Sequence, residues 1–180
     1  MPNNSVIKYQ RAFLHTTELV LGYLFERCED YAIKRFNKKR VYEEISDGLQ
    51  LDRRKIYSVF SRLENSKYIE FKDNSITLTD KAKIKIVDKV VTSMPADKKH
   101  RFISFDIPER LHYKRDMFRR TIKRMGFCQI QQSLWVTDKN VGDLVDIAAR
   151  EYKVEEYIAY LVVESTNIDK HIEHILQDNN

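Results

Sequence analysis

Apolar positions in the first half of the chain follow helical spacing in three places. Over residues 11–36 they predict one long helix that runs into a basic loop, "KRFNKKR". A shorter helix is predicted at residues 41–49. The third helix is the best marked, because Asp52 stands directly before it as a typical N-cap residue.

This third helix has four apolar residues at positions i, i+3, i+4 and i+7, which predicts a single buried stripe. These residues are Ile56, Val59, Phe60 and Leu63. Polar and cationic side chains then occupy the outward positions. They are Arg53, Arg54, Tyr57, Ser58, Ser61 and Arg62.

Two alternating stretches follow, "YIEFK" and "SITLT", and predict a hairpin that turns around Asp73 and Asn74. Two helices, a basic third helix and a hairpin, in this order, are typical of the winged variant of helix-turn-helix, whose third helix enters the major groove. We therefore predict a winged helix-turn-helix domain at residues 1–93. It ends with a helix capped by Asp80, and residues 94–100 are predicted to be an interdomain linker.

The second half alternates between strand and helix patterns. "RFISFDI" predicts a strand, and residues 110–125 predict a helix closed by Gly126. A close pair of strands in "FCQIQQ" and "SLWVT", a helix in "KNVGDLVDIAAREY" and a strand in "YIAYLVVES" complete the order βαββαβ. The predicted fold class is therefore α+β, with a ferredoxin-like domain at residues 101–166 and a helical tail at residues 167–180.

A four-stranded sheet of this kind has two faces, and its two helices cover only one of them. The other face carries part of the alternating apolar set and needs a cover of its own. A second copy of the chain is the simplest cover. We therefore expect a homodimer held by the ferredoxin-like half.

Composition changes this picture only in part. The 180 residues are 42% hydrophobic with four glycines and three prolines, which favours packed cores over disorder. The net charge of +5 favours anionic partners. Because no stretch is long and apolar enough to span a bilayer, and Cys28 and Cys128 lack metal-ligand spacing, we expect a cytoplasmic protein with free buried thiols and no membrane partner.

The first turn of the third helix indicates a nucleic-acid partner. Arg53, Arg54 and Lys55 lie beside the positive end of the helix dipole, where cations are unfavourable, so helix stability does not explain them. Phosphates would explain them, and we predict double-stranded DNA as the partner. The predicted DNA-binding residues are Arg53, Arg54, Lys55, Tyr57, Ser58, Ser61 and Arg62 of this helix, Lys38, Lys39 and Arg40 of the basic loop, and Lys72 and Asn74 of the hairpin. Winged domains also dock proteins, so a protein-docking scaffold stays open as an alternative.

Several motifs carry a resemblance to known families. "FISFDIPER", the basic helix after it and "GFCQIQQSLWV" resemble the pattern shared by the CRISPR-associated Cas-two family and the middle domain of PaaX-type repressors. "IYSVFSRLENSKYIE" resembles the PaaX N-terminal domain. The resemblance implies a dimeric transcriptional repressor that responds to an acyl-coenzyme A. The further C-terminal domain of that family has no counterpart in these 180 residues, so the small-molecule effector stays unknown.

The role implied for Asp106 differs between the two families. In the Cas-two family the aspartate that ends the first strand pairs with its copy across the dimer axis and holds one divalent metal for phosphodiester cleavage. The resemblance thus implies an alternative function: a nuclease or CRISPR adaptation subunit in which Asp106 is the metal ligand and catalytic residue, with Mg²⁺ or Mn²⁺ as cofactor. The regulator needs no cofactor, and there the Asp106 carboxylate would accept backbone N–H groups where the strand turns into the helix.

The helix predicted after Asp106 carries seven cations, and two interpretations of their role stay open. They either contact a duplex backbone or form the solvated side of an amphipathic helix. These cations are Arg110, Lys114, Arg115, Arg119, Arg120, Lys123 and Arg124.

Overall fold

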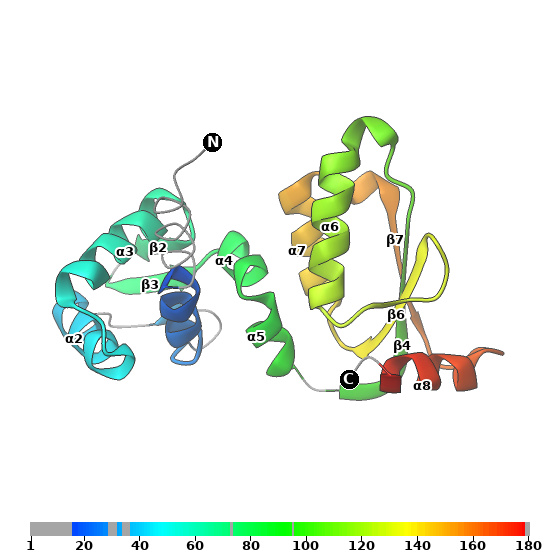
Figure 1. Cartoon of the computed structure of the whole chain (residues 1–180), viewed down its shortest axis with the longest axis horizontal. Coiled ribbons are helices and arrows are strands. Elements are labelled where there is room, and N and C mark those ends of the chain that lie inside the picture. Colours follow the sequence, from blue (N-terminus) through cyan, green and yellow to red (C-terminus); the bar gives the residue numbers. More distant parts are fainter. Residues whose placement is uncertain (1–15, 29–31, 34–36, 73, 95, 179–180) are drawn as a thin grey trace, which may run out of the picture. The chain divides into compact units, whose positions relative to one another are not determined.

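The computed structural model describes residues 16–28, 32–33, 37–72, 74–94 and 96–178. The chain forms two compact units, residues 1–86 and residues 87–180 (Figure 1). Each unit combines helices with a β-sheet, so the fold is mixed α+β as predicted.

The N-terminal unit joins helices to a small antiparallel sheet. Its described elements are a helix at residues 16–25, β1 (Ala32–Ile33), α2 (Lys38–Leu49), α3 (Arg53–Asn65), β2 (Ile69–Lys72), β3 (Ser75–Leu78) and α4 (Asp80–Lys85). The strand order is β1-β3-β2, and β3 pairs with both neighbours. The predicted hairpin is confirmed by β2 and β3, with Asn74 at a φ of 56° in its turn, and Asp73 lies outside the described residues.

The prediction of one helix over residues 11–36 is wrong within the described part of that range. The helix ends at residue 25, and Ala32 and Ile33 form β1 opposite Thr77 and Ile76 of β3. A two-residue strand has too few residues to show a period, and its hydrogen-bonding partner lies more than forty positions away in the sequence, so local pattern does not reveal it.

The predicted basic loop is wrong from Lys38 onward, because the loop residues begin α2. Asn37 caps this helix: its side-chain oxygen accepts a hydrogen bond from the backbone N–H of Arg40 at 3.1 Å. An N-cap oxygen satisfies one of the free N–H groups of the first turn and so permits a helix to begin at a cationic run. Residues 34–36 of the loop lie outside the described part of the chain.

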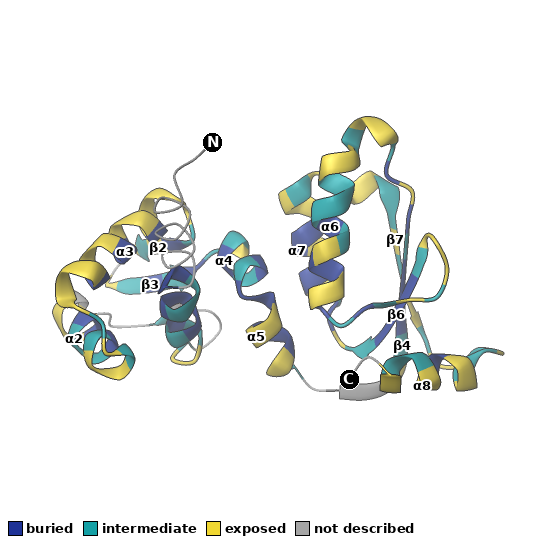
Figure 2. Ribbon diagram, viewed as in Figure 1, coloured by how far each residue is buried: buried dark blue, intermediate teal, exposed yellow. Residues whose placement is uncertain are grey.

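The helices of this unit bury their apolar sides (Figure 2). Leu21 and Leu24 of the first helix, Ile45 of α2 and Phe60 of α3 are each 1% exposed or less. Burying a side chain of this size stabilises the fold by about 1.5–3 kcal/mol. These contacts therefore hold each helix in one orientation.

The last helix predicted for this half is in fact two helices. After α4 ends at Lys85, α5 (Val87–Thr92) follows with one residue between them. Thr79 rather than Asp80 caps α4, because the Thr79 hydroxyl accepts the N–H of Ala82 at 3.3 Å.

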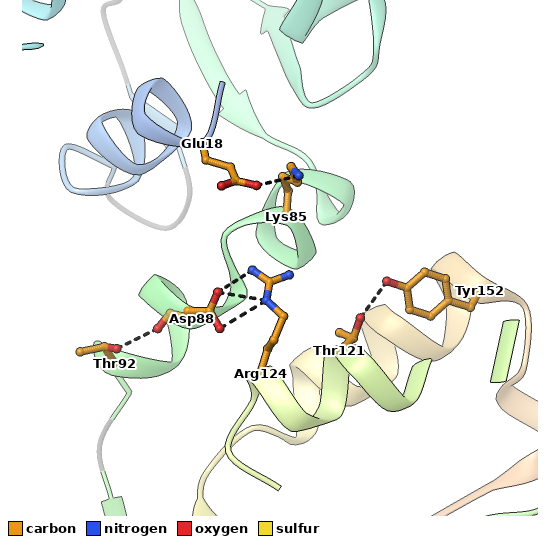
Figure 3. Close-up of polar contacts among 7 residues, drawn as sticks. All are labelled: Glu18, Lys85, Asp88, Thr92, Thr121, Arg124 and Tyr152. Atoms are coloured by element: carbon orange, nitrogen blue, oxygen red, sulfur yellow. Dashed lines mark hydrogen bonds and ion pairs between the residues drawn. The ribbon is translucent and has the colours of Figure 1, made fainter. Parts of the chain in front are cut away.

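An ion pair ties each of these short helices to its own unit (Figure 3). Lys85 of α4 contacts Glu18 of the first helix at 2.7 Å. Asp88 of α5 accepts a hydrogen bond from Arg124 Nε of α6 (His112–Arg124) at 3.0 Å. The division between the units therefore falls between α4 and α5, earlier than the predicted boundary after residue 93.

The second unit contains a four-stranded antiparallel sheet. Its elements are α5, β4 (Ala96–Phe105), a 3₁₀ turn η1 (Glu109–Leu111), α6, β5 (Cys128–Gln129), β6 (Leu134–Lys139), α7 (Gly142–Tyr152), η2 (Glu155–Tyr157), β7 (Ile158–Val163) and α8 (Asp169–Asp178). The strand order is β5-β6-β4-β7, so β4 pairs on both of its edges.

The predicted linker at residues 94–100 is wrong over most of its length, because β4 begins at Ala96. Ala96 lies opposite Lys139 of β6, and His100 lies opposite Val163 of β7. Charged residues occupy much of this part of the strand, so it lacks the apolar alternation by which strands are predicted.

One face of the sheet packs against α6 and α7. The ring of Phe105 in β4 lies 5.5 Å from Phe118 of α6, and Trp135 of β6 is 1% exposed. The hydroxyls of Thr121 and Tyr152 lie 2.8 Å apart and join α6 to α7 (Figure 3).

The opposite face is covered in part by α8, so the chain itself supplies part of the cover that we expected from a second copy. Ile172 of α8 is fully buried and packs with Phe102 and Val136. Partly buried residues around this cluster are Ile130, Leu134, Val163, Ile168 and Leu176. Leu161 of β7 remains 49% exposed. The predicted helical tail thus contributes to the core of the second unit.

Both cysteines are free thiols as predicted, but they are half-buried rather than buried. Burial raises the pKa of Cys28 to about 11. Burial, assisted by the charge of Asp138, also raises the pKa of Cys128. Because the thiolate is the reactive form, both thiols are weak nucleophiles near neutral pH.

Replacement of Ile172 by alanine tests the contribution of α8. We expect Ile172→Ala to lower the free energy of unfolding of the second unit by about 2–5 kcal/mol, since it leaves a cavity against Phe102 and Val136. The chain has a single tryptophan, Trp135 of this unit, so its fluorescence during urea denaturation reports this unit selectively. The exposed neighbour supplies a matched control, Glu173→Ala, and equal midpoints for the two variants would contradict the packing of α8.

Candidate nucleic-acid interface

Helix α3 begins where the sequence predicts, at the N-cap Asp52. One Asp52 carboxylate oxygen accepts the backbone N–H of Arg54 at 2.7 Å and that of Lys55 at 3.4 Å. This carboxylate also offsets the positive end of the helix dipole. It thereby stabilises a first turn made of cations.

The buried stripe predicted for α3 is confirmed. Its four apolar residues are each 1% exposed or less, namely Ile56, Val59, Phe60 and Leu63. The side chains predicted to lie outside are exposed, and Figure 2 shows exposed residues along this helix. They are Arg53, Arg54, Lys55, Tyr57, Ser58, Ser61 and Arg62.

The three first-turn cations differ in their partners. Arg53 lies 3.6 Å from Glu43 of α2, and both side chains are well exposed. An exposed pair of this kind contributes little stability, so breaking it costs little. The side chains of Arg54 and Lys55 have no ion-pair partner within the described residues. Arg54 and Lys55 are therefore the cations of this helix most available to an anion.

Tyr57 is the large exposed aromatic side chain on the outer side of α3. It is 56% exposed and stands edge-on to Tyr42 of α2, with ring centroids 4.8 Å apart. Tyr42 is 5% exposed, and its ring also lies tilted against that of Phe60, with centroids 4.2 Å apart. Burial, with the charges of Glu64 and Tyr57, raises the pKa of Tyr42 to about 12. The outer aromatic ring is thus held in place by buried rings beneath it.

The remaining predicted DNA-binding residues lie on two other elements. Lys39 and Arg40 are exposed in the first turn of α2, and Arg40 pairs with Glu44 at 2.8 Å. The side chain of Lys38 lies outside the described part of the structure. Lys72 and Asn74 are exposed at the turn of the β2–β3 hairpin. The predicted residues therefore belong to three elements of the N-terminal unit.

Asp106 lies at the end of β4, in the second unit. Its backbone N–H donates to the carbonyl of Tyr157 at 3.0 Å, and its side chain is exposed. Its carboxylate forms no hydrogen bond with another described residue, so the predicted acceptance of backbone N–H groups is wrong for the residues that the structure describes. Asp106 lines a pocket together with Arg115 and Arg119 of α6.

The comparisons with known proteins concern this second unit. Residues 93–175 match the family model of the PaaX protein central Cas2-like domain. This segment therefore belongs to the PaaX central Cas2-like domain family. This match confirms the resemblance that we predicted from "FISFDIPER", the basic helix after it and "GFCQIQQSLWV". Cas2 is the family called Cas-two above. No curated protein and no solved structure gives a significant match to the chain.

Within the Cas2-like domain, the surroundings of Asp106 do not favour a divalent cation. Two guanidinium groups line the same pocket, and a cation there would be repelled by both. No group of three or more His, Cys, Asp or Glu side chains that could hold a metal occurs in the described ranges. The donor set of a single chain therefore does not fit Mg²⁺ or Mn²⁺.

The two arginines of this pocket were not singled out by sequence reasoning, which treated all cations of α6 alike. Arg115 and Arg119 stand four residues apart and so share one side of the helix. This spacing, in a helix that follows a strand and Asp106, was the signal in the sequence that could have identified these two arginines as neighbours of Asp106. In contrast, Arg120 is exposed and Arg124 pairs with Asp88.

None of the helices in the described residues is both long enough and apolar enough to cross a membrane.

The raised pKa of Tyr42 predicts a loss of stability at high pH. An unfolded tyrosine ionises near pH 10, whereas folded Tyr42 keeps its proton until about pH 12, so the folded state binds more protons in between. The stabilisation is complete below pH 10 and is lost as the pH rises toward 12. Absorbance at 295 nm should show a late phenolate step that Tyr42→Phe lacks, and identical titrations of the two proteins would contradict the burial.

Proposed function

We propose that the chain is a PaaX-type transcriptional regulator that binds duplex DNA as a homodimer. The observation that carries the proposal is the first turn of α3, where Arg54 and Lys55 are exposed and have no anionic partner within the described residues. Cations in that position oppose the helix dipole. A DNA phosphate supplies the missing anion.

We interpret the N-terminal unit as a winged helix-turn-helix domain. The order of helix, β1, α2, α3 and the β2–β3 hairpin supports this, as does a sheet in which β3 pairs with both β1 and β2. In this arrangement α3 is the recognition helix that enters the major groove, and the hairpin is the wing.

The side chains of α3 have two roles: some position the helix on the DNA backbone, and others recognise the bases. Arg54 and Lys55 bind backbone phosphates and set the register of the helix on the duplex. Tyr57, Ser58 and Ser61 present hydroxyl groups that donate to and accept from base edges. Other residues assigned to phosphates are Arg53, Arg62, Lys38, Lys39, Arg40, Lys72 and Asn74.

We interpret the second unit as a ferredoxin-like dimerisation domain. The order β4-α6-β5-β6-α7-β7 and the sheet order β5-β6-β4-β7 support this interpretation. Among described residues β7 pairs only with β4, and it contains no charged residue. Soluble proteins protect apolar edge strands by pairing or covering them. We therefore assign the dimer contact to β7, where Leu161 and Val162 are 49% and 53% exposed.

A symmetric dimer carries two copies of α3 and so recognises a nearly palindromic operator, with half-sites one helical turn or a multiple of it apart. The mechanism requires no metal or organic cofactor. A small-molecule effector is not assigned by these features, and the location that suits this activity is the cytoplasm.

The salt dependence of DNA binding tests the role of α3. Replacing Arg54 and Lys55 together by alanine removes two phosphate contacts, so the slope of log K against log salt should fall by roughly 1.8, at about 0.9 per contact. Affinity for a random-sequence duplex, measured by fluorescence anisotropy from 50 to 200 mM salt, gives this slope. A protein-docking scaffold would instead show no affinity even at low salt.

The control for this measurement removes equal charge elsewhere. Arg120 of α6 and Lys170 of α8 are exposed, and their joint replacement by alanine lowers the net charge by the same two units. We expect this variant to keep most of its affinity and its slope. If both double variants lost the same slope, binding would follow total charge and the assignment to α3 would be rejected.

The dimer contact is tested by placing charges on β7. We expect Leu161→Glu combined with Val162→Glu to convert a dimer of twice 21.5 kDa into a monomer, because carboxylates would be buried unpaired in the contact. Tyr113→Glu is the control, since Tyr113 is 70% exposed and belongs to α6 rather than to β7. Sedimentation velocity measures both, and a wild-type monomer at micromolar concentration would reject the proposed dimer.

Metal-dependent phosphodiester cleavage is the second function that the family resemblance implies. It receives less support, because Asp106 shares its pocket with Arg115 and Arg119 rather than with further carboxylates. A second carboxylate would have to come from the other copy in the dimer.

A further inference from the structure

The pocket at the end of β4 is a separate feature of the second unit. Its volume is about 420 Å³, within the range of small-molecule sites. It is lined by the end of β4, by one side of α6 and by the loop before β6, including Ser104, Asp106, Arg115, Arg119, Gln132 and Ser133. All of these residues belong to the Cas2-like domain.

Arg119 is the cation of this pocket that has no anionic partner among the described residues. Its guanidinium lies 5.9 Å from the ring centroid of the buried Phe105, and it forms no ion pair with any described residue. Its Nε is inaccessible to water and has no hydrogen-bond acceptor within those residues. A guanidinium held against an aromatic ring loses part of its hydration, and an external oxyanion at its terminal nitrogens would compensate for this loss.

Arg115 lies one helical turn before Arg119 and is partly neutralised. One terminal nitrogen of Arg115 contacts Glu109 at 2.8 Å, and the Glu109 side chain is 81% exposed. The Nε of Arg115 is also buried without an acceptor in the described structure. The Glu109 contact holds the Arg115 side chain in place but leaves other guanidinium donors for a ligand.

Neutral donors and one acceptor complete the lining. The side chains of Ser104, Gln132 and Ser133 form no hydrogen bond with other described residues. Asp106 lines the same pocket but forms no ion pair with Arg115 or Arg119, so its carboxylate is not held by either guanidinium. The pocket therefore offers donors for an oxyanion and, separately, a carboxylate that accepts a donor.

We propose that this pocket binds a small phosphate ester that carries hydroxyl groups. Arg119 and Arg115 bind the phosphate oxygens, and Asp106 accepts a hydrogen bond from a ligand hydroxyl. A phosphate suits Arg115 and Arg119 because a guanidinium group can donate two parallel hydrogen bonds to two phosphate oxygens. The hydroxyl follows from Asp106, since a carboxylate beside a bare phosphate would only repel it. This site is independent of the proposed DNA binding by α3.

Amide chemical shifts in ¹⁵N-labelled full-length protein test the proposal without DNA. The probes are ribose 5-phosphate, inorganic phosphate and ribose, which separate the whole ligand from its phosphate and its hydroxyls. We expect shifts at residues 104–107, 115–119 and 132–133, with ribose 5-phosphate binding at least threefold more tightly than phosphate. Ribose alone should cause no shift at equal concentration.

Three variants assign the roles of the side chains. Arg119→Ala should weaken ribose 5-phosphate about 10- to 100-fold, the range expected for charged hydrogen bonds. Arg120→Ala is the matched control, because it removes the same charge from the exposed neighbouring position and should change binding less than twofold. Asp106→Ala should strengthen inorganic phosphate and remove the preference for ribose 5-phosphate. Trp135 fluorescence checks that each variant is folded.

Several results would overturn the site. Equal weakening by Arg119→Ala and Arg120→Ala would mean attraction to the general charge of α6. Shifts confined to the first turn of α3 would place the phosphate at the DNA interface instead. A DNA duplex that displaced ribose 5-phosphate from residues 115–119 would assign the pocket to a nucleic-acid phosphate and reject a small ester.

Discussion

Strand β4 is the element on which the second unit depends, because it pairs on both edges and is packed on both faces. Its alternation places Phe105 against α6 and Phe102 against α8. Asp106 follows the last residue of β4 directly and lines a pocket together with Arg115 and Arg119 of α6. The pairing of β4 with β6 and β7 therefore fixes one wall of this pocket.

An analogous constraint governs the N-terminal unit. The buried stripe of α3 determines which side of that helix meets solvent, and the Asp52 cap determines where its first turn lies. Together they leave Arg54 and Lys55 outside, next to a helix dipole that disfavours them. Rotating the helix to hide these cations would expose Phe60 and its neighbours, at a cost of about 1.5–3 kcal/mol for each apolar side chain. The orientation of the cations is therefore secured by the core.

Features with a local cause could be predicted from the sequence, and features with a distant cause could not. The α3 stripe and its cap depend on residues within one helix, so periodicity and cap chemistry identify them. In contrast, β1 exists because Ala32 and Ile33 pair with residues of β3 that lie more than forty positions away in the sequence. Likewise, the half-burial of Arg119 depends on Phe105, which lies on another element. Sequence spacing therefore predicted a cationic helix but not which of its cations would line a pocket.

The distribution of partners among the cations is more informative than the net charge of +5. Arg40 and Arg124 each have an acid from the chain itself, at 2.8 Å and 2.5 Å, and so need no external anion. Arg54 and Arg119 have no such acid within the described residues, although the chain contains 27 acidic residues. An unpaired guanidinium keeps its full attraction for an anion, whereas a paired one must first give up its partner. One unpaired cation lies on an exposed helix and the other in a pocket, so the first suits an extended polyanion and the second a small one.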